Sequence, residues 1–514
     1  MRSFRRLAYA AVGCSSLLAS AAPQLDYAAR AFAQLDRLVT CDYSAPLGIF
    51  PLEALWQSGN TVEAVANAVA LLRDGTGEAA APGRVAAWLA LLNNSFAKTP
   101  VIVDQCFDDH QWWLHAWVRA AEVAGELAYA ERAAAVFDFV VSNGWTPTYC
   151  GGGVSWCPVS GSNVPYKNAV TTSLFFAAAM ALVPHEASVG KPAGFFLGWA
   201  QKAWAWLDAS GMQAADGLFN DGLQQSNCEN NGQTTCELCA PSLPRSRTGA
   251  QRTSRGFSRS SGVAHLRNSS SPPSGTYNQG LALSGLGRLA ATTPGGNATL
   301  LAAALRLQTA ATSLLTTAGG ILAEPCGNNC DNDQHIFKGV WARHAAYLAS
   351  AQPSARALSA PFLDAQAQSL LANAACATGG YGNLWQGPPC SSHSGASDSA
   401  ALDLLLAAAH VAPPPAAGQW AAIGVGQCVD GEGRSMPLCT GLVASEAACR
   451  AAAEADAAAV AYAVETGCLG VSTCSLSTTA ATCAPGFKAT AGTGATGVTA
   501  VDGKALALCV VRPA

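Results

Sequence analysis

Apolar residues recur at helical spacing along most of this chain of 514 residues, from Leu25 to about His410. The apolar runs are rich in alanine and leucine, and clusters of Gly, Pro and Asn separate them. Residues at positions i, i+3, i+4 and i+7 share one face of a helix, so the spacing predicts amphipathic helices. We expect helices over residues 25–38, 60–73, 82–95, 109–127, 129–142, 168–183, 192–210, 277–291, 297–317, 338–351, 357–374 and 398–411.

Strand patterns are nearly absent before residue 420. Segments in which β-branched residues alternate with polar ones are scarce there, which argues against a parallel sheet. The expected helices can instead form an irregular bundle, a superhelical solenoid or a closed ring of six helical hairpins. The intervals between the helices are uneven, and this lack of a fixed period disfavours the solenoid.

The chain changes character after His410. The segment "HVAPPPAAGQW" predicts a proline-stiffened linker at about residues 412–420, which would end a helical domain of residues 22–411. Residues 421–514 hold seven cysteines and one expected helix near 444–457, which predicts a small disulfide-rich α+β module. The odd number of cysteines leaves open a free thiol, a bridge to the helical domain or a lost partner. Cysteine spacing around "ASEAACRAAAEA" and "CAPGF" resembles the PAN/apple type of domain, which implies a module that binds glycan or protein.

Residues 1–21 are typical of a cleavable secretory signal. Arg2, Arg5 and Arg6 precede a short apolar run, and Ala19 and Ala21 stand at the spacing of a cleavage site. The run is too short for a membrane span, and no apolar tail follows "VVRPA". We therefore expect a secreted or cell-wall glycoprotein, with N-glycosylation sequons that begin at Asn93, Asn268 and Asn297.

The 19 cysteines indicate disulfides, because such a chain would fold in an oxidising compartment. Neighbours in sequence are the first candidates, and we expect the pairs Cys150/Cys157, Cys326/Cys330 and Cys376/Cys390. A zinc site would need a cytosolic setting and better ligand spacing, so we predict no metal and no cofactor.

The balance of charge excludes a polyanion as the main partner. Only 12% of residues are charged and the net charge is −4, so we expect no binding to nucleic acid. An exception is the segment from Cys236 to Gly275, which carries six arginines among serines and prolines and predicts a disordered insertion at about 236–275. It can be interpreted as a basic patch for an anionic polymer, as a surface insertion or as an error in the gene model.

Two adjacent carboxylates, Asp108 and Asp109, precede three tryptophans in "QCFDDHQWWLHAW". Aspartate favours the first turn of a helix, where free N–H groups and the helix dipole stabilise negative charge, so one of the two could be a cap. A second carboxylate about 5 Å away costs roughly 3 kcal/mol of repulsion at an effective dielectric near 20. One acid would then ionise early and the other late, which suits the nucleophile and the general acid of a glycosidase.

The tryptophans divide by helical geometry. Trp113 and Trp117 share a face with alanines and are interpreted as core, although Trp113 also remains a candidate for substrate contact. Trp112 lies on a flank and is the better candidate for stacking on a sugar ring. His110 and His115 lack a third ligand at useful spacing, which favours ordinary hydrogen bonding over metal binding.

Further polar clusters stand where expected helices begin. In a ring of hairpins every second helix starts on the same side, so these clusters could converge on one cleft. Amides, aromatics and lysines suit neutral hydroxyl groups, although each cluster could also be a simple cap. Glycines 151 to 153 could let the backbone approach a sugar, because glycine has no Cβ. The candidate substrate-binding residues are Gly152, Tyr166, Lys167, Asn168, Tyr277, Asn278, Gln279, Phe337 and Lys338.

The motifs together resemble one known family. "DD" followed by "WW", then "YKNA", "ADGLFNDGL", "TYNQG", "FKGVWAR" and "SALDLLLAA" in this order resembles glycoside hydrolase family 76, the endo-α-1,6-mannanases and their fungal wall relatives. The resemblance covers about residues 25–411. It implies an (α/α)₆ barrel with a cleft on one face and a retaining double displacement, with Asp108 as the nucleophile and Asp109 as the general acid/base. Ser274 and Gly275 stand where the family usually has an aromatic residue, which puts one subsite in doubt.

The resemblance implies a hydrolase acting on α-mannan or a related wall polysaccharide. Two alternatives remain open at this stage. Fungal relatives are thought to be transglycosylases that attach mannose-bearing anchors to wall glucan. A wall-binding protein without turnover is the other alternative, and the presence of both aspartates argues against it.

Overall fold

The structure is a computed structural model. It describes residues 27–411 except 52, 75–81, 104–105, 159–163, 233–274, 293–296, 378, 389 and 391–392. Beyond these it describes residues 421–425, 428–429, 438–443, 446–456, 459–466, 472–478, 483, 488–490, 500–501 and 507–511. The predicted signal at 1–21, the predicted linker at 412–420 and the predicted insertion, apart from Gly275, lie outside the described residues.

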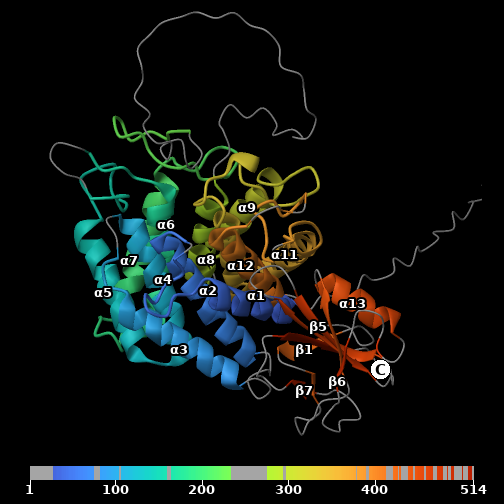
Figure 1. Cartoon of the computed structure of the whole chain (residues 1–514). Coiled ribbons are helices and arrows are strands. Elements are labelled where there is room, and N and C mark those ends of the chain that lie inside the picture. The colour runs from blue at the N-terminus through green and yellow to red at the C-terminus, as the bar shows by residue number, and fades with distance from the viewer. Residues whose placement is uncertain are drawn as a thin grey trace, which may run out of the picture.

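The described part of residues 27–411 is helical, as the sequence predicts (Figure 1). None of the helices described is long and apolar enough to span a membrane. The helices are α1 (Tyr27–Cys41), α2 (Leu55–Asp74), α3 (Pro82–Lys98), α4 (Phe107–Ala124), α5 (Leu127–Asn143), α6 (Ala169–Leu182), α7 (Phe195–Ala209), α8 (Thr276–Thr292), α9 (Ala298–Leu314), α10 (Phe337–Ala351), α11 (Pro353–Asn373) and α12 (Gly395–Val411).

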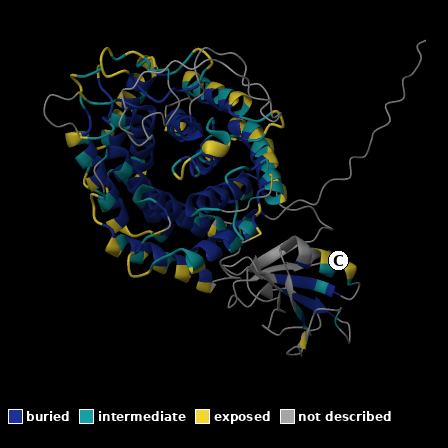
Figure 2. Cartoon of the chain, turned by 45° about the horizontal axis from the view of Figure 1, so that its top comes forward, coloured by how far each residue is buried: buried dark blue, intermediate teal, exposed yellow. Residues whose placement is uncertain are grey.

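The even-numbered helices form a closed inner ring. Each of them contacts the next, from α2 through α4, α6, α8, α10 and α12 back to α2, and the odd-numbered helices pack outside (Figure 2). The burial patterns explain this division. Every residue of α6 is buried, as expected for a helix covered on all sides, whereas α9 buries only Ala304, Leu307, Gln308 and Ala311, a single stripe. The mainly α class and the (α/α)₆ barrel are confirmed.

The inner helices run in the same direction. Trp56, Val170, Tyr277, Phe337 and Ala396, from the first turns of α2, α6, α8, α10 and α12, meet Trp112 of α4 in one apolar cluster. All six inner helices therefore begin at one end of the ring, here called the N-terminal mouth, and end at the C-terminal mouth. Small residues allow the close packing: a Cβ on Gly339 of α10 would lie 2.5 Å from Cα of Ala400 on α12.

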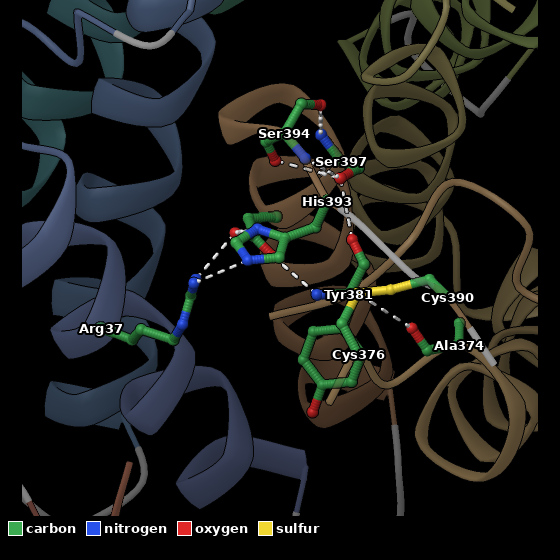
Figure 3. The surroundings of a disulfide bond; sticks show 9 residues. Arg37, Ala374, Cys376, Tyr381, Cys390, His393, Ser394 and Ser397 are labelled. Atoms are coloured by element: carbon green, nitrogen blue, oxygen red, sulfur yellow. Dashed lines mark hydrogen bonds and ion pairs between the residues drawn. A yellow bond between two sulfur atoms is a disulfide. The ribbon is translucent and has the colours of Figure 1, made fainter. Parts of the chain in front are cut away.

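Polar contacts join α1, which lies outside the ring, to the start of α12 (Figure 3). Nη1 of Arg37 on α1 lies 2.7 Å from Oδ2 of Asp398 on α12, and Nδ1 of His393 lies 2.7 Å from the same oxygen. Oδ1 of Asp398 accepts a hydrogen bond of 2.7 Å from the backbone N–H of Tyr381. The disulfide Cys376–Cys390 closes the loop that carries Tyr381. These contacts fix the start of α12 at the N-terminal mouth.

The C-terminal part is a small α+β unit beside α1 (Figure 1). Its main sheet is antiparallel with strand order β1-β8-β4-β5-β3-β6, and β2 pairs with β7. The disulfides Cys439–Cys483 and Cys449–Cys474 hold it together, so the predicted disulfide-rich character is confirmed. The bounds are β1 (Ala421–Val425), β2 (Cys428–Val429), β3 (Leu438–Val443), α13 (Glu446–Ala455), β4 (Ala459–Thr466), β5 (Ser472–Thr478), β6 (Lys488–Thr490), β7 (Ala500–Val501) and β8 (Ala507–Val511).

Candidate active site

The two aspartates occupy the first turn of α4 at the N-terminal mouth. The segment before them is held by the glycine-containing loop that ends at Cys157. Cys106 forms a disulfide with Cys157, and the backbone N–H of Phe107 donates to the carbonyl of Trp156 at 2.7 Å. No side chain caps α4 at Cys106, so the first-turn N–H groups remain available to the acids. The predicted position of the pair at a helix start is therefore what the structure shows.

An oxygen of Asp108 and one of Asp109 lie within 4.8 Å of each other. Retaining glycosidases hold their two carboxyl groups about 5 to 5.5 Å apart, whereas inverting enzymes leave about 6.5 to 9.5 Å for a water molecule. The short separation fits direct attack by one carboxylate on a sugar.

Trp156 fixes the orientation of Asp108. Its indole Nε1–H donates to Oδ2 of Asp108 at 2.9 Å, while Oδ1 is buried and makes no hydrogen bond within the described part of the chain. The side chain of Asp108 thus has one oxygen held and one oxygen without a partner.

Burial raises the pKa of Asp108 to about 7. The residue is only 9% exposed, and removing a carboxylate from water disfavours its charged form. The Trp156 hydrogen bond opposes this shift, and the nearby charge of Asp221 adds to it. Asp108 consequently becomes a carboxylate only as the pH approaches neutrality. The resemblance gives Asp108 the role of nucleophile, which requires the carboxylate and therefore a pH near or above neutrality.

A third carboxylate, Asp221, lies beside the pair. Its Oδ2 accepts a hydrogen bond from the hydroxyl of Tyr166, which accepts one of 2.9 Å from Nδ2 of Asn231. Burial raises the pKa of Asp221 to about 6. The sequence reasoning did not nominate Asp221, although it is the second aspartate of "ADGLFNDGL". Gly222 makes this contact possible, because a Cβ there would lie 2.6 Å from the Tyr166 hydroxyl oxygen.

Aromatic side chains form one wall of the mouth. The rings of Tyr277 and Phe337 stack with centroids 3.8 Å apart, and those of Trp56 and Trp112 lie 5.5 Å apart. Trp112 is only 3% exposed, so Trp56, which is half-buried, has more surface available to a ligand. Trp56 was not a predicted site residue, because the expected helix began at residue 60.

Most of the other predicted binding residues hold the framework together. Nζ of Lys167 donates to the carbonyl of Gly153 at 2.5 Å, and burial lowers the pKa of Lys167 to about 7. Asn168 is the N-cap of α6 and accepts from the N–H of Thr171. The amide of Gln279 bonds both to the N–H and to the C=O of Phe219, at 2.8 and 2.9 Å.

Lys338 and Asn278 are also buried. Nζ of Lys338 donates to the carbonyl of Asn383 and lies 4.7 Å from the ring centroid of Trp385. Glu324, near Lys338, accepts from the hydroxyl of Thr276. Burial raises the pKa of Glu324 and lowers that of Lys338, because each charged form loses water.

Two sequence expectations are corrected here. Cys150 pairs with Cys228 and Cys157 with Cys106, so the expected pair Cys150/Cys157 is wrong, whereas Cys326–Cys330 and Cys376–Cys390 are confirmed. A Cβ at Gly152 would lie 2.9 Å from the Trp206 ring, so packing by itself requires glycine there, and contact of Gly152 with a sugar stays a prediction. Trp113 is fully buried and donates its indole N–H to the carbonyl of Leu55, so it belongs to the core.

One set of side chains near the pair has the spacing of a cation site. The sulfur of Cys106 and the carboxylates of Asp108 and Asp109 lie within 4.8 Å of one another. Cys106 is bonded to Cys157, however, and a disulfide sulfur is not the thiolate that binds metals. Two adjacent aspartates alone make a poor cage for a cation, since hard cations take six or more oxygen ligands.

Comparisons with known proteins identify a family and a shared fold. The family model described as "Glycosyl hydrolase family 76" matches residues 28–238 and 263–411. A Schizosaccharomyces pombe protein named "Putative mannan endo-1,6-alpha-mannosidase" is 29% identical over 144 residues, which are 26% of this chain and 31% of that protein. The chain thus spans about a third of that curated relative.

Solved structures share the fold. An inactive variant of the α-1,6-mannanase GH76A of Salegentibacter sp. HEL1_6, in complex with α-1,6-mannotetrose, has a TM-score of 0.57 and 17% identity; the match covers 76% of this chain and 100% of that one. Dfg5 from Chaetomium thermophilum in complex with glucosamine has a TM-score of 0.51 and 17% identity, covering 70% and 82%.

Proposed function

We propose that this chain, which belongs to glycosyl hydrolase family 76, is a secreted retaining hydrolase that cleaves α-1,6-mannosidic linkages in mannan or a related wall glycan. The observation that carries the proposal is the pair Asp108 and Asp109, close together in the first turn of α4 at the N-terminal mouth of the ring. Two similar proteins support the substrate class by their names: one is named for mannan, and the other was solved with α-1,6-mannotetrose.

The reaction follows from the two carboxyl groups. Oδ1 of Asp108 attacks the anomeric carbon, the bond from that carbon to the leaving O6 breaks, and Asp109 donates its proton to O6. This step leaves a mannosyl ester on Asp108. A water molecule then attacks the same carbon, Asp109 takes the proton of the water, and the ester bond to Asp108 breaks. Two inversions at one carbon return the original α configuration.

The residues around the two aspartates have distinct expected roles. Trp156 holds Oδ2 of Asp108 and so fixes the orientation of this carboxyl group. The half-buried Trp56 offers an aromatic face next to Trp112 on which a mannose ring can stack. Asp221 and Tyr166 present an acceptor and a hydroxyl beside the acids, groups that can bind sugar hydroxyls.

Secretion is part of the proposal. The disulfides Cys106–Cys157 and Cys150–Cys228 brace the site, and such bonds persist in oxidising compartments. The predicted signal at residues 1–21 agrees with that setting.

An azide experiment tests the two roles separately. In Asp108→Ala, azide can take the place of the missing nucleophile, and one inversion of an activated α-mannobioside gives a β-mannosyl azide. In Asp109→Ala, the ester still forms from an activated leaving group, and azide attack gives the α-azide. Exchange of these two products would reverse the assignment, and normal cleavage of α-1,6-mannan by either variant would exclude the mechanism.

A transglycosylase with the same residues remains the second candidate, since the Dfg5 structure with bound glucosamine shares the fold. The chemistry differs only in the acceptor that attacks the ester. Incubation of the enzyme with α-1,6-mannotetraose distinguishes the two: mannose and mannobiose are expected from a hydrolase. Oligosaccharides longer than the substrate, or hybrids with an added glucan acceptor, would support the transglycosylase.

A further inference from the structure

A second cavity opens at the C-terminal mouth, opposite the aspartates. Its volume is about 390 Å³, and its described lining comes from the second halves of α2, α4, α8, α10 and α12. Arg119 in this lining stands three turns beyond Asp108 on α4, which is about 16 Å at 1.5 Å per residue. This cavity is therefore separate from the proposed active site.

A buried ion network lies between the two mouths. Arg343 of α10 pairs with Glu63 at 2.5 Å and with Asp403 at 2.6 Å, and all three side chains are at most 3% exposed. Two carboxylates thus satisfy this guanidinium, which also lines the inner end of the cavity. Because Arg343 is already paired with two carboxylates, we expect the side chains nearer the solvent to recognise a ligand in the cavity.

The outer part of the cavity has more cations than anions. The guanidinium groups of Arg119 and Arg288 lie 6.0 and 5.7 Å from the ring centroid of Tyr347. Glu122 lies 2.5 Å from Nη1 of Arg119 but 4.0 Å from Nη2 of Arg288. The single carboxylate of Glu122 therefore neutralises only part of the charge of the two guanidinium groups. Each of these three side chains is about a quarter exposed.

Arg288 is the unsatisfied member of this group. Among the residues that the structure describes it makes no hydrogen bond, and its contacts are Glu122 at 4.0 Å and the Tyr347 ring. A guanidinium near the end of a helix is favoured by the helix dipole, which could by itself explain an arginine here. That explanation would be stronger if Arg288 donated to a carbonyl of the last turn, and no such bond is present in the described part.

The rest of the lining is largely apolar. Ala70, Leu71, Leu406 and Ala407 contribute aliphatic surface, and Ser350 and His410 stand near the outer edge of α10 and α12. The cavity thus combines a free guanidinium with an aliphatic wall. Its size lies within the range of about 300 to 1,000 Å³ that is typical of small-molecule sites.

We propose that the cavity at the C-terminal mouth binds a small organic anion, whose carboxylate or phosphate contacts Arg288 and Arg119 and whose carbon skeleton packs on Leu71, Leu406 and Ala407. The planar fork of a guanidinium matches both anionic groups and can hold either with two hydrogen bonds. Burial lowers the pKa of His344, and the positive charges of His115, Arg343 and Arg288 add to this shift.

Titration calorimetry on the full chain tests the proposal with four probes: hexyl phosphate, hexanoate, inorganic phosphate and hexanol. The proposal requires an anionic probe with a carbon chain to bind best, whether hexyl phosphate or hexanoate, and hexanol to bind at least tenfold more weakly than that probe. Equal binding of hexanol, or no binding of either chain-bearing anion at millimolar concentration, would overturn it.

Three variants locate the site. Arg288→Gln should weaken binding of the best probe at least tenfold, because the free guanidinium is lost. Glu122→Gln should tighten it several-fold, because the competing carboxylate is removed, whereas a purely structural role for Glu122 predicts no gain. Arg306→Gln, at an exposed arginine of α9, is the matched control and should leave the affinity unchanged. An equal loss in Arg288→Gln and Arg306→Gln, or weaker binding by Glu122→Gln, would refute the site.

Activity on α-1,6-mannan serves as a folding control in these experiments. Arg288 and Glu122 lie at the mouth opposite Asp108, so both variants should retain the wild-type activity. Should the proposed mannanase activity itself be absent, the melting temperature replaces it as the folding control, and the binding result stands independently.

Discussion

The hydrogen bond from Trp156 to Asp108 should set the acid limb of the pH profile. Replacing Trp156 by Phe keeps an aromatic ring but removes the N–H that donates to Oδ2 at 2.9 Å. A hydrogen bond to a charged group contributes about 1.5 to 3 kcal/mol. At about 1.4 kcal/mol per pKa unit, its loss should raise the pKa of Asp108 by about one to two units. The site is 9% exposed, so water can replace little of this bond.

The direction in which the acid limb of the pH profile moves follows from the role of Asp108 as nucleophile. Only the carboxylate attacks, so activity falls as the pH drops through the pKa of Asp108, which is about 7 in the unaltered protein. In Trp156→Phe the limb should move to about pH 8 to 9. The assay is kcat/KM on an activated α-1,6-mannobioside from pH 5 to 10. At pH 6 the variant should be about ten- to a hundredfold slower, and the deficit should shrink at high pH.

Trp206 supplies the matched control. The indole N–H of Trp206 donates at 2.8 Å to the carbonyl of Cys150. Cys150 belongs to the same loop as Trp156, but this hydrogen bond does not involve Asp108 or Asp109. Trp206→Phe should therefore cost stability without moving the limb. Equal shifts of the acid limb of the pH profile in both variants would contradict this prediction. So would a wild-type pH profile in a folded Trp156→Phe variant.

Three further outcomes follow from the structure. Asp108 has a higher pKa in the folded state, about 7 against 3.8, so folding stability is present at low pH and lost as the pH rises between these values. Asp108→Asn should thus be the more stable protein at pH 8, by roughly 4 kcal/mol in denaturant unfolding, and equal to wild type near pH 4. Arg343→Met should lower the free energy of unfolding by about 3 to 5 kcal/mol, because Glu63 and Asp403 would remain buried without their partner; Arg306→Met, which is exposed, should change it little. Trp56→Ala should reduce kcat/KM on mannan oligosaccharides about tenfold with an unchanged melting temperature, and full activity would exclude Trp56 as a sugar platform.

Tertiary contacts explain why α2 begins earlier than the sequence pattern predicts. The segment "LWQSGN" contains Ser, Gly and Asn, which favour loops, and the expected helix began at residue 60. In the structure α2 begins at Leu55, because the polar side chains find partners outside the helix. Ser58 accepts from the N–H of Phe50, and Gln57 donates to the carbonyl of Asn332 at 2.9 Å. Local propensity is weak against such bonds, and Trp56 was missed for this reason.

The roles of the polar helix starts could not be read from the sequence either. Lys167, Asn168, Gln279 and Lys338 all stand at the N-terminal mouth, as the alternation of helix directions predicts. Their side chains nevertheless bond to neighbouring backbone. Amide and ammonium donors suit a backbone carbonyl as well as a sugar hydroxyl, so residue type and spacing cannot choose between the two.

The sequence by itself determined most of the helices and the position of two acids at a helix start, whereas the ring of hairpins was implied by the family resemblance. These features depend on periodicity and on residues close together along the chain. Tertiary structure alone decided the disulfides Cys106–Cys157 and Cys150–Cys228, the approach of Asp221 to the pair and the raised pKa of Asp108. Each depends on distance and burial in space, and residues 51 to 113 positions apart along the chain become neighbours only when the ring closes.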